Sequence, residues 1–130
     1  MRLKPLADYL AANLPELKEG KTLFVNQMPV DIPFGLMLKE SFGGTQIDGE
    51  LIGRRRGKFQ VVARSKDYAA GEAIVIKAMN ALSIVETLLP GNAVFIRNMR
   101  PLTKPVAYML TAGNNFEFSV NMSAIYDIVA

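Results

Sequence analysis

Histidine and cysteine are both absent from the 130 residues. Without cysteine, the chain can form no disulfide and offers no thiolate as nucleophile or ligand. Without histidine, it lacks the usual general base at neutral pH and the commonest metal ligand. A nucleophile activated by histidine is therefore excluded, and the carboxylates do not show the spacing of a calcium-binding loop. We predict that the protein is not an enzyme and uses no cofactor or metal.

Long apolar runs are lacking as well. No stretch approaches the ~20 consecutive apolar residues that cross a bilayer, and the first 20 residues carry charges throughout, unlike a secretion signal. Half of the residues are apolar and 21% are charged, which is typical of a globular domain. We expect a single soluble domain over residues 1–130, because this length supports one hydrophobic core.

Positive charge is concentrated in the middle of the chain. Residues 51–104 hold ten basic and three acidic side chains, whereas the parts before and after them are net acidic. Four basic residues, Arg54, Arg55, Arg56 and Lys58, fall within five positions. We expect them on a loop beside a strand. Such a cluster fits contact with nucleic acid or with an acidic protein surface, and it fits a solvated face equally well.

The clearest structural pattern runs from Gly57 to Leu89. Alternate residues are apolar over 59–63, which predicts a strand with one covered face. From about Ala70, apolar residues recur every three or four positions, which predicts one long amphipathic helix. Asp67 is a suitable N-cap and Pro90-Gly91 a suitable stop. The apolar stripe of this predicted helix consists of Ile74, Val75, Ala78, Ala81, Leu82, Val85, Leu88 and Leu89.

Three apolar residues of the predicted helix, Ile76, Met79 and Ile84, lie outside that stripe. A helix that is apolar beyond one stripe is contacted from more than one side. The second contact could come from another element of the same chain, such as the N-terminal helix, or from a neighbouring subunit. We predict a partner or subunit surface that comprises Arg54, Arg55, Arg56, Lys58, Ile76, Met79 and Ile84.

The flanking segments supply a second helix and further strands. Helical spacing from Leu3 to Leu14 predicts a short N-terminal helix. Strands are predicted at 22–28, 34–39, 93–99, 106–111 and 115–126. The first two of these strands could pair as a hairpin, and Gly113-Asn114 would join the last two as another. The apolar residues Ile128 and Val129 at the chain end could extend into a neighbour.

These elements predict an α+β fold. The expected architecture is a single mixed, largely antiparallel sheet of about five strands, with a long central helix and an N-terminal helix packed on it. Residues 40–57 contain five glycines and no sustained period. We expect a flexible loop there, because segments of this length without secondary structure are uncommon in small domains and are often functional.

The segment from Phe59 to Leu82 resembles the tail terminator proteins, also called tail completion or minor capsid proteins, of long-tailed bacteriophages. It combines a strand, the motif Arg64-Ser65-Lys66-Asp67-Tyr68 and the predicted long helix. The N-terminal helix and the hairpin over 105–126 follow in the same order as in that family. The resemblance covers most of the chain, and the basic cluster at Arg54–Arg56 departs from it.

The resemblance implies a virion structural protein that assembles as a ring, usually a hexamer, on the end of a completed tail tube. Such a ring ends tube polymerisation and presents the surface that joins the DNA-filled head. The implied partners are further copies of the chain, the tail tube protein, a head-completion or connector protein, and DNA passing through the ring, with no membrane. The implied location is the head–tail junction of the virion, after assembly in the host cytoplasm.

Two other functions stay open from the residues alone. A head–tail connector or neck component would place the basic cluster against DNA or against the acidic rim of a neighbour. A small non-specific nucleic-acid-binding protein would use the same cluster to neutralise phosphates. Phe42 is the only aromatic residue of the basic loop region that could stack on a base, so sequence-specific recognition is not predicted.

Overall fold

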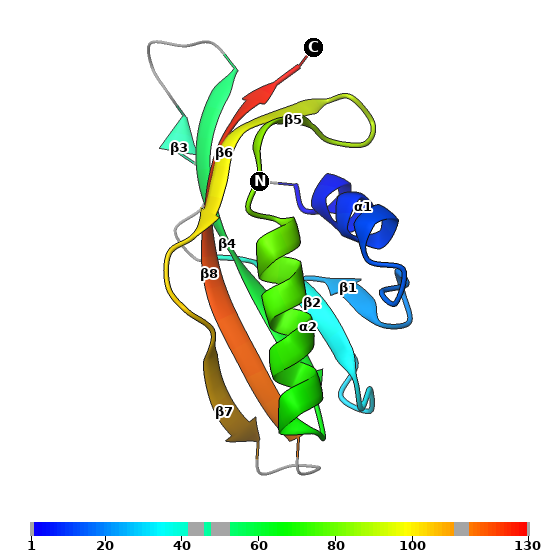
Figure 1. Cartoon of the computed structure of the whole chain (residues 1–130). Helices are drawn as coiled ribbons and strands as arrows, with labels where there is room; N and C mark the ends of the chain where they lie inside the picture. Colours follow the sequence, from blue (N-terminus) through cyan, green and yellow to red (C-terminus); the bar gives the residue numbers. More distant parts are fainter. Residues whose placement is uncertain (1, 42–45, 48–52, 111–114, 130) are drawn as a thin grey trace.

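The computed structural model describes residues 2–41, 46–47, 53–110 and 115–129 (Figure 1). Its elements in chain order are α1 (Lys4–Asn13), β1 (Leu23–Val25), β2 (Gly35–Glu40), β3 (Gln46–Ile47), β4 (Arg54–Ser65), α2 (Tyr68–Ala81), β5 (Val85–Leu88), β6 (Val94–Pro101), β7 (Val106–Leu110) and β8 (Asn115–Ile128). All strands belong to one eight-stranded sheet with the order β1-β2-β4-β8-β6-β5, in which β3 also pairs with β4 and β7 with β8.

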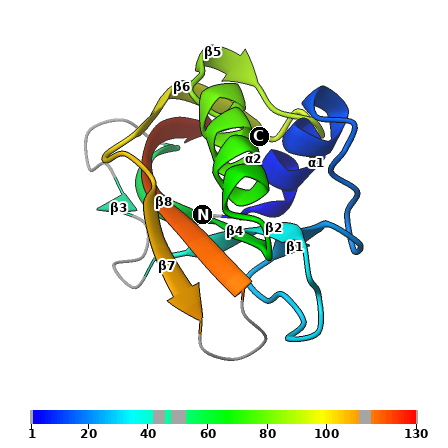
Figure 2. The ribbon, with the colours of Figure 1, turned by 60° about the horizontal axis from the view of Figure 1, so that its bottom comes forward.

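The long strands β4 and β8 form the middle of the sheet. They pair antiparallel along the whole of β4, from Arg54 opposite Asp127 to Ser65 opposite Phe116. The other side of β4 is shared by β2 and β3, and the other side of β8 by β6 and β7. Figure 2 shows how β7 and β8 lie together at the end of the sheet away from β5. The predicted hairpin of the last two strands is therefore confirmed as an antiparallel pair.

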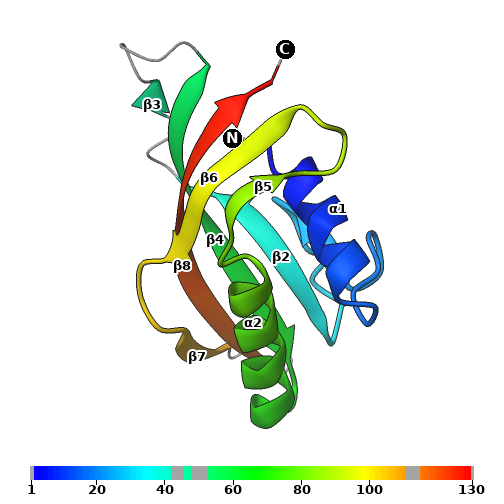
Figure 3. The ribbon, with the colours of Figure 1, turned by 45° about the horizontal axis from the view of Figure 1, so that its top comes forward.

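The face of β4 and β8 that carries Phe59 and Phe118 is the inner face of the sheet, and α2 lies against it (Figure 1). The apolar residues of the inner face join those of both helices in one buried cluster. We call the opposite face the outer face. Among the described residues, neither helix covers it (Figure 3). The buried inner residues of the two central strands are Phe59, Val61, Ala63, Phe118, Val120, Met122, Ala124 and Tyr126.

Helix α2 begins as the sequence predicts. The carboxylate of Asp67 accepts a hydrogen bond from the backbone N–H of Ala69 at 3.2 Å, which satisfies one free donor of the first turn. One turn later, Gly71 faces the sheet. A Cβ atom at Gly71 would lie 2.6 Å from the Phe118 ring, so the absence of a side chain here allows the helix to approach β8 closely.

The predicted long central helix and the count of about five strands are wrong. The structure is a mostly stranded mixed sheet with two short helices, and α2 ends at Ala81 after 14 residues. The Ser83 hydroxyl donates to the Met79 carbonyl at 2.8 Å, and the backbone of Ile84 then exchanges hydrogen bonds with Met99. The residues after Ala81 include several β-branched side chains, which pack well on a sheet.

Because α2 ends at Ala81, the last residues of the predicted stripe lie outside the helix. Leu82 and Leu89 are buried as expected, but Val85 and Leu88 belong to β5 and are 63% and 47% exposed. β5 pairs with β6 and forms one end of the sheet (Figure 3).

The predicted hairpin of the first two strands is also wrong, because β1 and β2 pair in parallel. The connection between them does not make a tight turn. Asn26 leaves β1 with a left-handed backbone (φ 64°), and its side-chain oxygen accepts from the backbone N–H of Glu40 at 3.0 Å. The chain then returns to the start of β2 through a long crossing segment, which a parallel pair requires.

Candidate interaction surface

The prediction that the basic cluster lies on a loop is wrong, because all four residues belong to β4, which begins at Arg54. Strand alternation divides the cluster between the two faces of the sheet. Arg54, Arg56 and Lys58 belong to the outer face, since they alternate with the buried inner residues of β4. Arg55 lies on the inner side opposite Tyr126, and its guanidinium donates to the Arg54 carbonyl at 3.1 Å. The remainder of the predicted loop includes residues 42–45 and 48–52, which lie outside the described residues, and its flexibility stays a prediction.

At one end of the outer face, Arg54 contributes to a network of charges around Asp127. Arg54 Nε donates to Asp127 Oδ1 at 2.8 Å, and Arg97 Nε donates to Oδ2 at 2.7 Å. The Arg54 hydrogen bond, followed by that of Arg97, lowers the pKa of the Asp127 carboxyl to about 2. Arg97 also reaches Glu86 at 3.3 Å and lies 4.8 Å from the centre of the Phe95 ring. This network joins β4, β5, β6 and β8.

At the other end of the outer face, Arg64 and Glu117 form an ion pair of 3.1 Å whose side chains are only 11% and 12% exposed. They are direct neighbours across β4 and β8. Arg64 Nη1 also donates to the Pro29 carbonyl at 2.7 Å. Arg64 therefore fixes the crossing segment between β1 and β2 to the outer face.

Between these two ends lies a group of exposed cations that we call the basic strip. It consists of Lys39, Arg56, Lys58 and Arg100. Within the described part of the chain, none of the four side chains forms an ion pair or a side-chain hydrogen bond. Two of them, Lys39 and Arg100, are distant in sequence from the predicted cluster, and the sheet register brings them to the same face. Sequence reasoning missed them because only strand pairing shows which face they share.

The motif from Arg64 to Tyr68 has a local structural role. The Ser65 hydroxyl accepts from the backbone N–H of Asp67 at 3.0 Å, and Asp67 caps α2. The Tyr68 ring meets the rings of Phe116 and Phe118 edge-on, with centroids 5.4 and 5.0 Å apart. The motif thus forms the turn from β4 into α2, and such edge-to-face contacts stabilise the packing of the helix start on β8.

The three predicted helix-surface residues have different environments. Ile76 is 37% exposed, whereas Met79 and Ile84 are partly buried and pack against the core of the same chain. Larger exposed apolar side chains occur at one end of the sheet. At that end they are Val85 and Leu88 of β5, and Ile128 and Val129 of the C-terminal end, while Val30, Leu102 and Val106 are exposed elsewhere. The β-branched residues Ile84, Val85 and Thr87 were the signal in the sequence for an exposed strand at Val85–Leu88.

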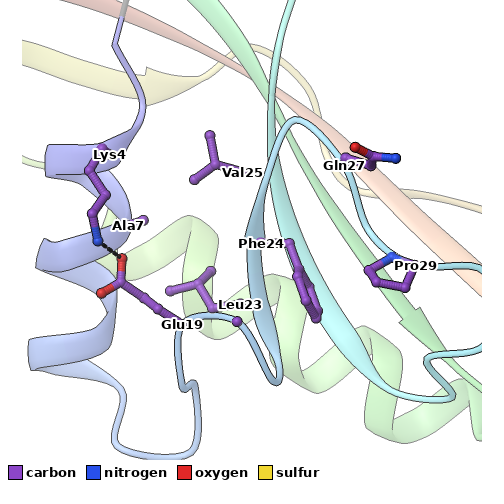
Figure 4. A pocket seen from close by; sticks show the side chains of 9 residues that line it. Lys4, Ala7, Glu19, Leu23, Phe24, Val25, Gln27 and Pro29 are labelled. Carbon is purple, nitrogen blue, oxygen red and sulfur yellow. Dashed lines mark hydrogen bonds and ion pairs between the residues drawn. The ribbon is translucent and has the colours of Figure 1, made fainter.

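A shallow groove of about 400 Å³ lies between α1 and β1 (Figure 4). Lys4 on its rim donates to Glu19 at 2.7 Å and to Asp8 at 2.9 Å, and these two hydrogen bonds raise the pKa of the Lys4 ammonium to about 12. Leu23, Phe24, Val25 and Pro29 supply much of its lining.

The described residues contain no group of three or more His, Cys, Asp or Glu side chains that could hold a metal ion. No helix in the described part of the chain is long and apolar enough to span a membrane.

Comparison with known protein families identifies the chain. The family model described as "Bacteriophage tail terminator protein" matches residues 14–128. The chain belongs to this family. The match extends beyond the segment that carries the resemblance in the sequence, and includes all of the strands. It establishes this tail terminator as a structural component of a bacteriophage tail, and the predicted family is confirmed.

A solved structure shares the fold of this tail terminator. A chain from the virion of a native gene transfer agent particle is 14% identical, with a TM-score of 0.59, over 91% of this chain and 84% of its own length. A second solved chain is 20% identical over 98% of this chain and 90% of its own, but its TM-score of 0.46 is too low to support an argument. No curated protein matches the sequence.

Proposed function

We propose that this tail terminator assembles as a hexameric ring on the end of a completed tail tube, stops tube polymerisation and presents the surface that joins the head. The observation that carries the proposal is the family match over residues 14–128. The absence of histidine and cysteine supports a role through protein contacts rather than catalysis. The acting surfaces are then subunit and tube contacts.

The exposed end of the sheet at β5 supports a ring contact. A ring needs heterologous contacts, in which two different surfaces of each copy meet. β5 is the last strand of the sheet, and in the described part of the chain its second edge has no strand partner. Val85 and Leu88 present apolar side chains there, and Ile128 lies at the same end of the sheet. We assign this edge to one half of the contact and the groove between α1 and β1 to the other half.

The test compares two double variants of the full chain by light scattering and negative-stain microscopy. Val85→Asp with Leu88→Asp places charge on the β5 edge, so we expect the ring to be lost while circular dichroism stays unchanged. Val106→Asp with Leu102→Asp is the matched control, because these side chains are 61% and 46% exposed and lie elsewhere. The control should still form rings. A wild-type chain that stays monomeric at assembly concentrations would contradict the ring, and rings of the β5 variant would contradict the assigned edge.

A further inference from the structure

The middle of the outer face combines cations from three strands in one register. Lys58 of β4 and Arg100 of β6 both pair with Ser123 of β8, so they flank it on either side. One row along, Lys39 of β2 is opposite Gln60, which is opposite Asn121. Arg56 continues the line of Lys58 along β4. Residues paired directly across a sheet project to the same face, so these side chains form one polar surface.

The two acidic residues of the central strands on this face do not neutralise the basic strip. Asp127 bonds Arg54 and Arg97 at one end, and Glu117 bonds Arg64 at the other. The four cations of the strip are all exposed. Among the residues that the structure describes, the surface therefore keeps a net positive charge in its middle, where an anionic partner would be attracted.

The side chains between the cations favour a phosphate backbone over a protein. Protein interfaces have an apolar core that is rich in aromatic residues and depleted in charge. Here the positions between the cations are Gln60, Asn121 and Ser123, the partly buried Ile125 pairs with Arg56, and the neighbouring row holds the buried Val62. Lysine, arginine, serine, asparagine and glutamine are the side chains that commonly contact DNA phosphates.

The side chains of the basic strip favour duplex DNA over single strands. Recognition of single strands relies on aromatic side chains that stack on bases. The positions that pair between the four cations are not aromatic.

We propose that the outer face of the sheet binds the phosphate backbone of double-stranded DNA without sequence preference, through Lys39, Arg56, Lys58 and Arg100. Arg54 and Arg55 of the sequence-predicted cluster are not part of this surface, because one is bonded to Asp127 and the other lies on the inner side. The surface belongs to each copy of the chain and does not require the ring.

The experiment measures binding of the full chain to a labelled random-sequence DNA duplex by fluorescence anisotropy from 50 to 200 mM salt. For four phosphate contacts, log K should fall with log salt at a slope of about −3 to −4. The strip variant replaces all four cations by glutamine: Lys39→Gln, Arg56→Gln, Lys58→Gln and Arg100→Gln. It should bind the duplex at least about tenfold more weakly than wild type at the lowest salt, with a salt slope close to zero.

The matched control removes four charges elsewhere: Arg2→Gln, Lys18→Gln, Lys21→Gln and Lys66→Gln, all at exposed positions. It should keep the wild-type slope. The proposal is overturned if wild-type protein does not bind at low salt, or if the control loses as much affinity as the strip variant. Tighter binding to a single strand of the same length, or displacement of DNA by polyglutamate at equal charge concentration, would also overturn it. The mass of the ring formed by the strip variant is measured as well. Because DNA binding does not require the ring, this variant should still form rings, so a failure of DNA binding is distinguished from a failure of the proposed function.

Discussion

The inner and outer faces of β4 and β8 are stabilised by different interactions, although both are made by the same two strands. On the inner face, Phe59, Val61 and Met122 are completely or almost completely buried beneath the helices. On the outer face, ion pairs at the two ends, around Asp127 and around Arg64, hold neighbouring strands together. Hydrophobic burial therefore sets the fold, whereas the charged ends of the outer face leave a central surface available for a partner.

The inner face should be the most sensitive to substitution. Phe59 is fully buried, and Phe59→Ala should lower the free energy of unfolding by about 4 kcal/mol because it removes buried apolar area and leaves a cavity. Its neighbour Gln60 is on the outer face, and Gln60→Ala should change the free energy by less than about 0.5 kcal/mol. Urea denaturation measures both. Equal losses of the free energy of unfolding in the two variants would show that the two faces do not differ in their contribution to stability.

The Arg64 end of the outer face should come next. Arg64→Ala removes the ion pair with Glu117 from a nearly buried site and removes a donor from the Pro29 carbonyl. We expect a loss of about 3 kcal/mol in the free energy of unfolding. Lys66→Ala, at an exposed position two residues later, is the control and should have little effect. Replacing both partners, by Arg64→Met with Glu117→Leu, should recover most of the loss.

The close approach of α2 to the inner face predicts a smaller effect. Gly71→Ala raises helix propensity by about 1 kcal/mol, but the new methyl group overlaps the Phe118 ring. Overpacking should exceed the gain, for a net loss of about 1 kcal/mol. A double-mutant cycle combines Gly71→Ala with Phe118→Leu. The losses of stability of the two single variants should sum to more than the loss of the double variant. Strict additivity would show that the helix does not press on that ring.

The Asp127 network predicts an effect of similar size, and one that depends on pH. Because the pKa of Asp127 falls from an ordinary 3.8 to about 2 in the folded chain, its stabilising contribution is present above pH 4 and is lost as the pH drops towards 2. Asp127→Asn should therefore be less stable than wild type by about 1 kcal/mol at pH 7 and should approach the stability of wild type as the pH falls below 2. A difference that persists unchanged at pH 2 would contradict this account. Asp31→Asn, which removes an exposed carboxylate without an ion pair among the described residues, is the control.

Much of the inner face was predictable. Alternation over 59–63 identified β4, Asp67 marked the start of α2, and the alternation after 115 identified β8. The motif that begins at Arg64 also indicated the family. In the structure this motif forms the turn from β4 into α2. Local patterns suffice where one strand or helix faces one core.

The rest depended on contacts between distant residues. Helical spacing continues through Val85 and Leu88 and competes with the β-branched residues that favour a strand, so the backbone pairing of Ile84 with Met99 decides that the chain has become a strand. Arg54 and Asp127 are 73 positions apart, and no local pattern identifies them as partners. The basic strip is likewise visible only after the register of β2, β4, β8 and β6 is known.

The central functional claim is that this tail terminator caps the tail tube. The most direct measurement is the length of tubes assembled from purified tail tube protein, with and without the full chain, by negative-stain electron microscopy. The account predicts that adding the chain during assembly stops growth and leaves additional density at one tube end, and that the Val85→Asp, Leu88→Asp variant does neither. An unchanged length distribution with bare tube ends in the presence of the folded wild-type chain would contradict it.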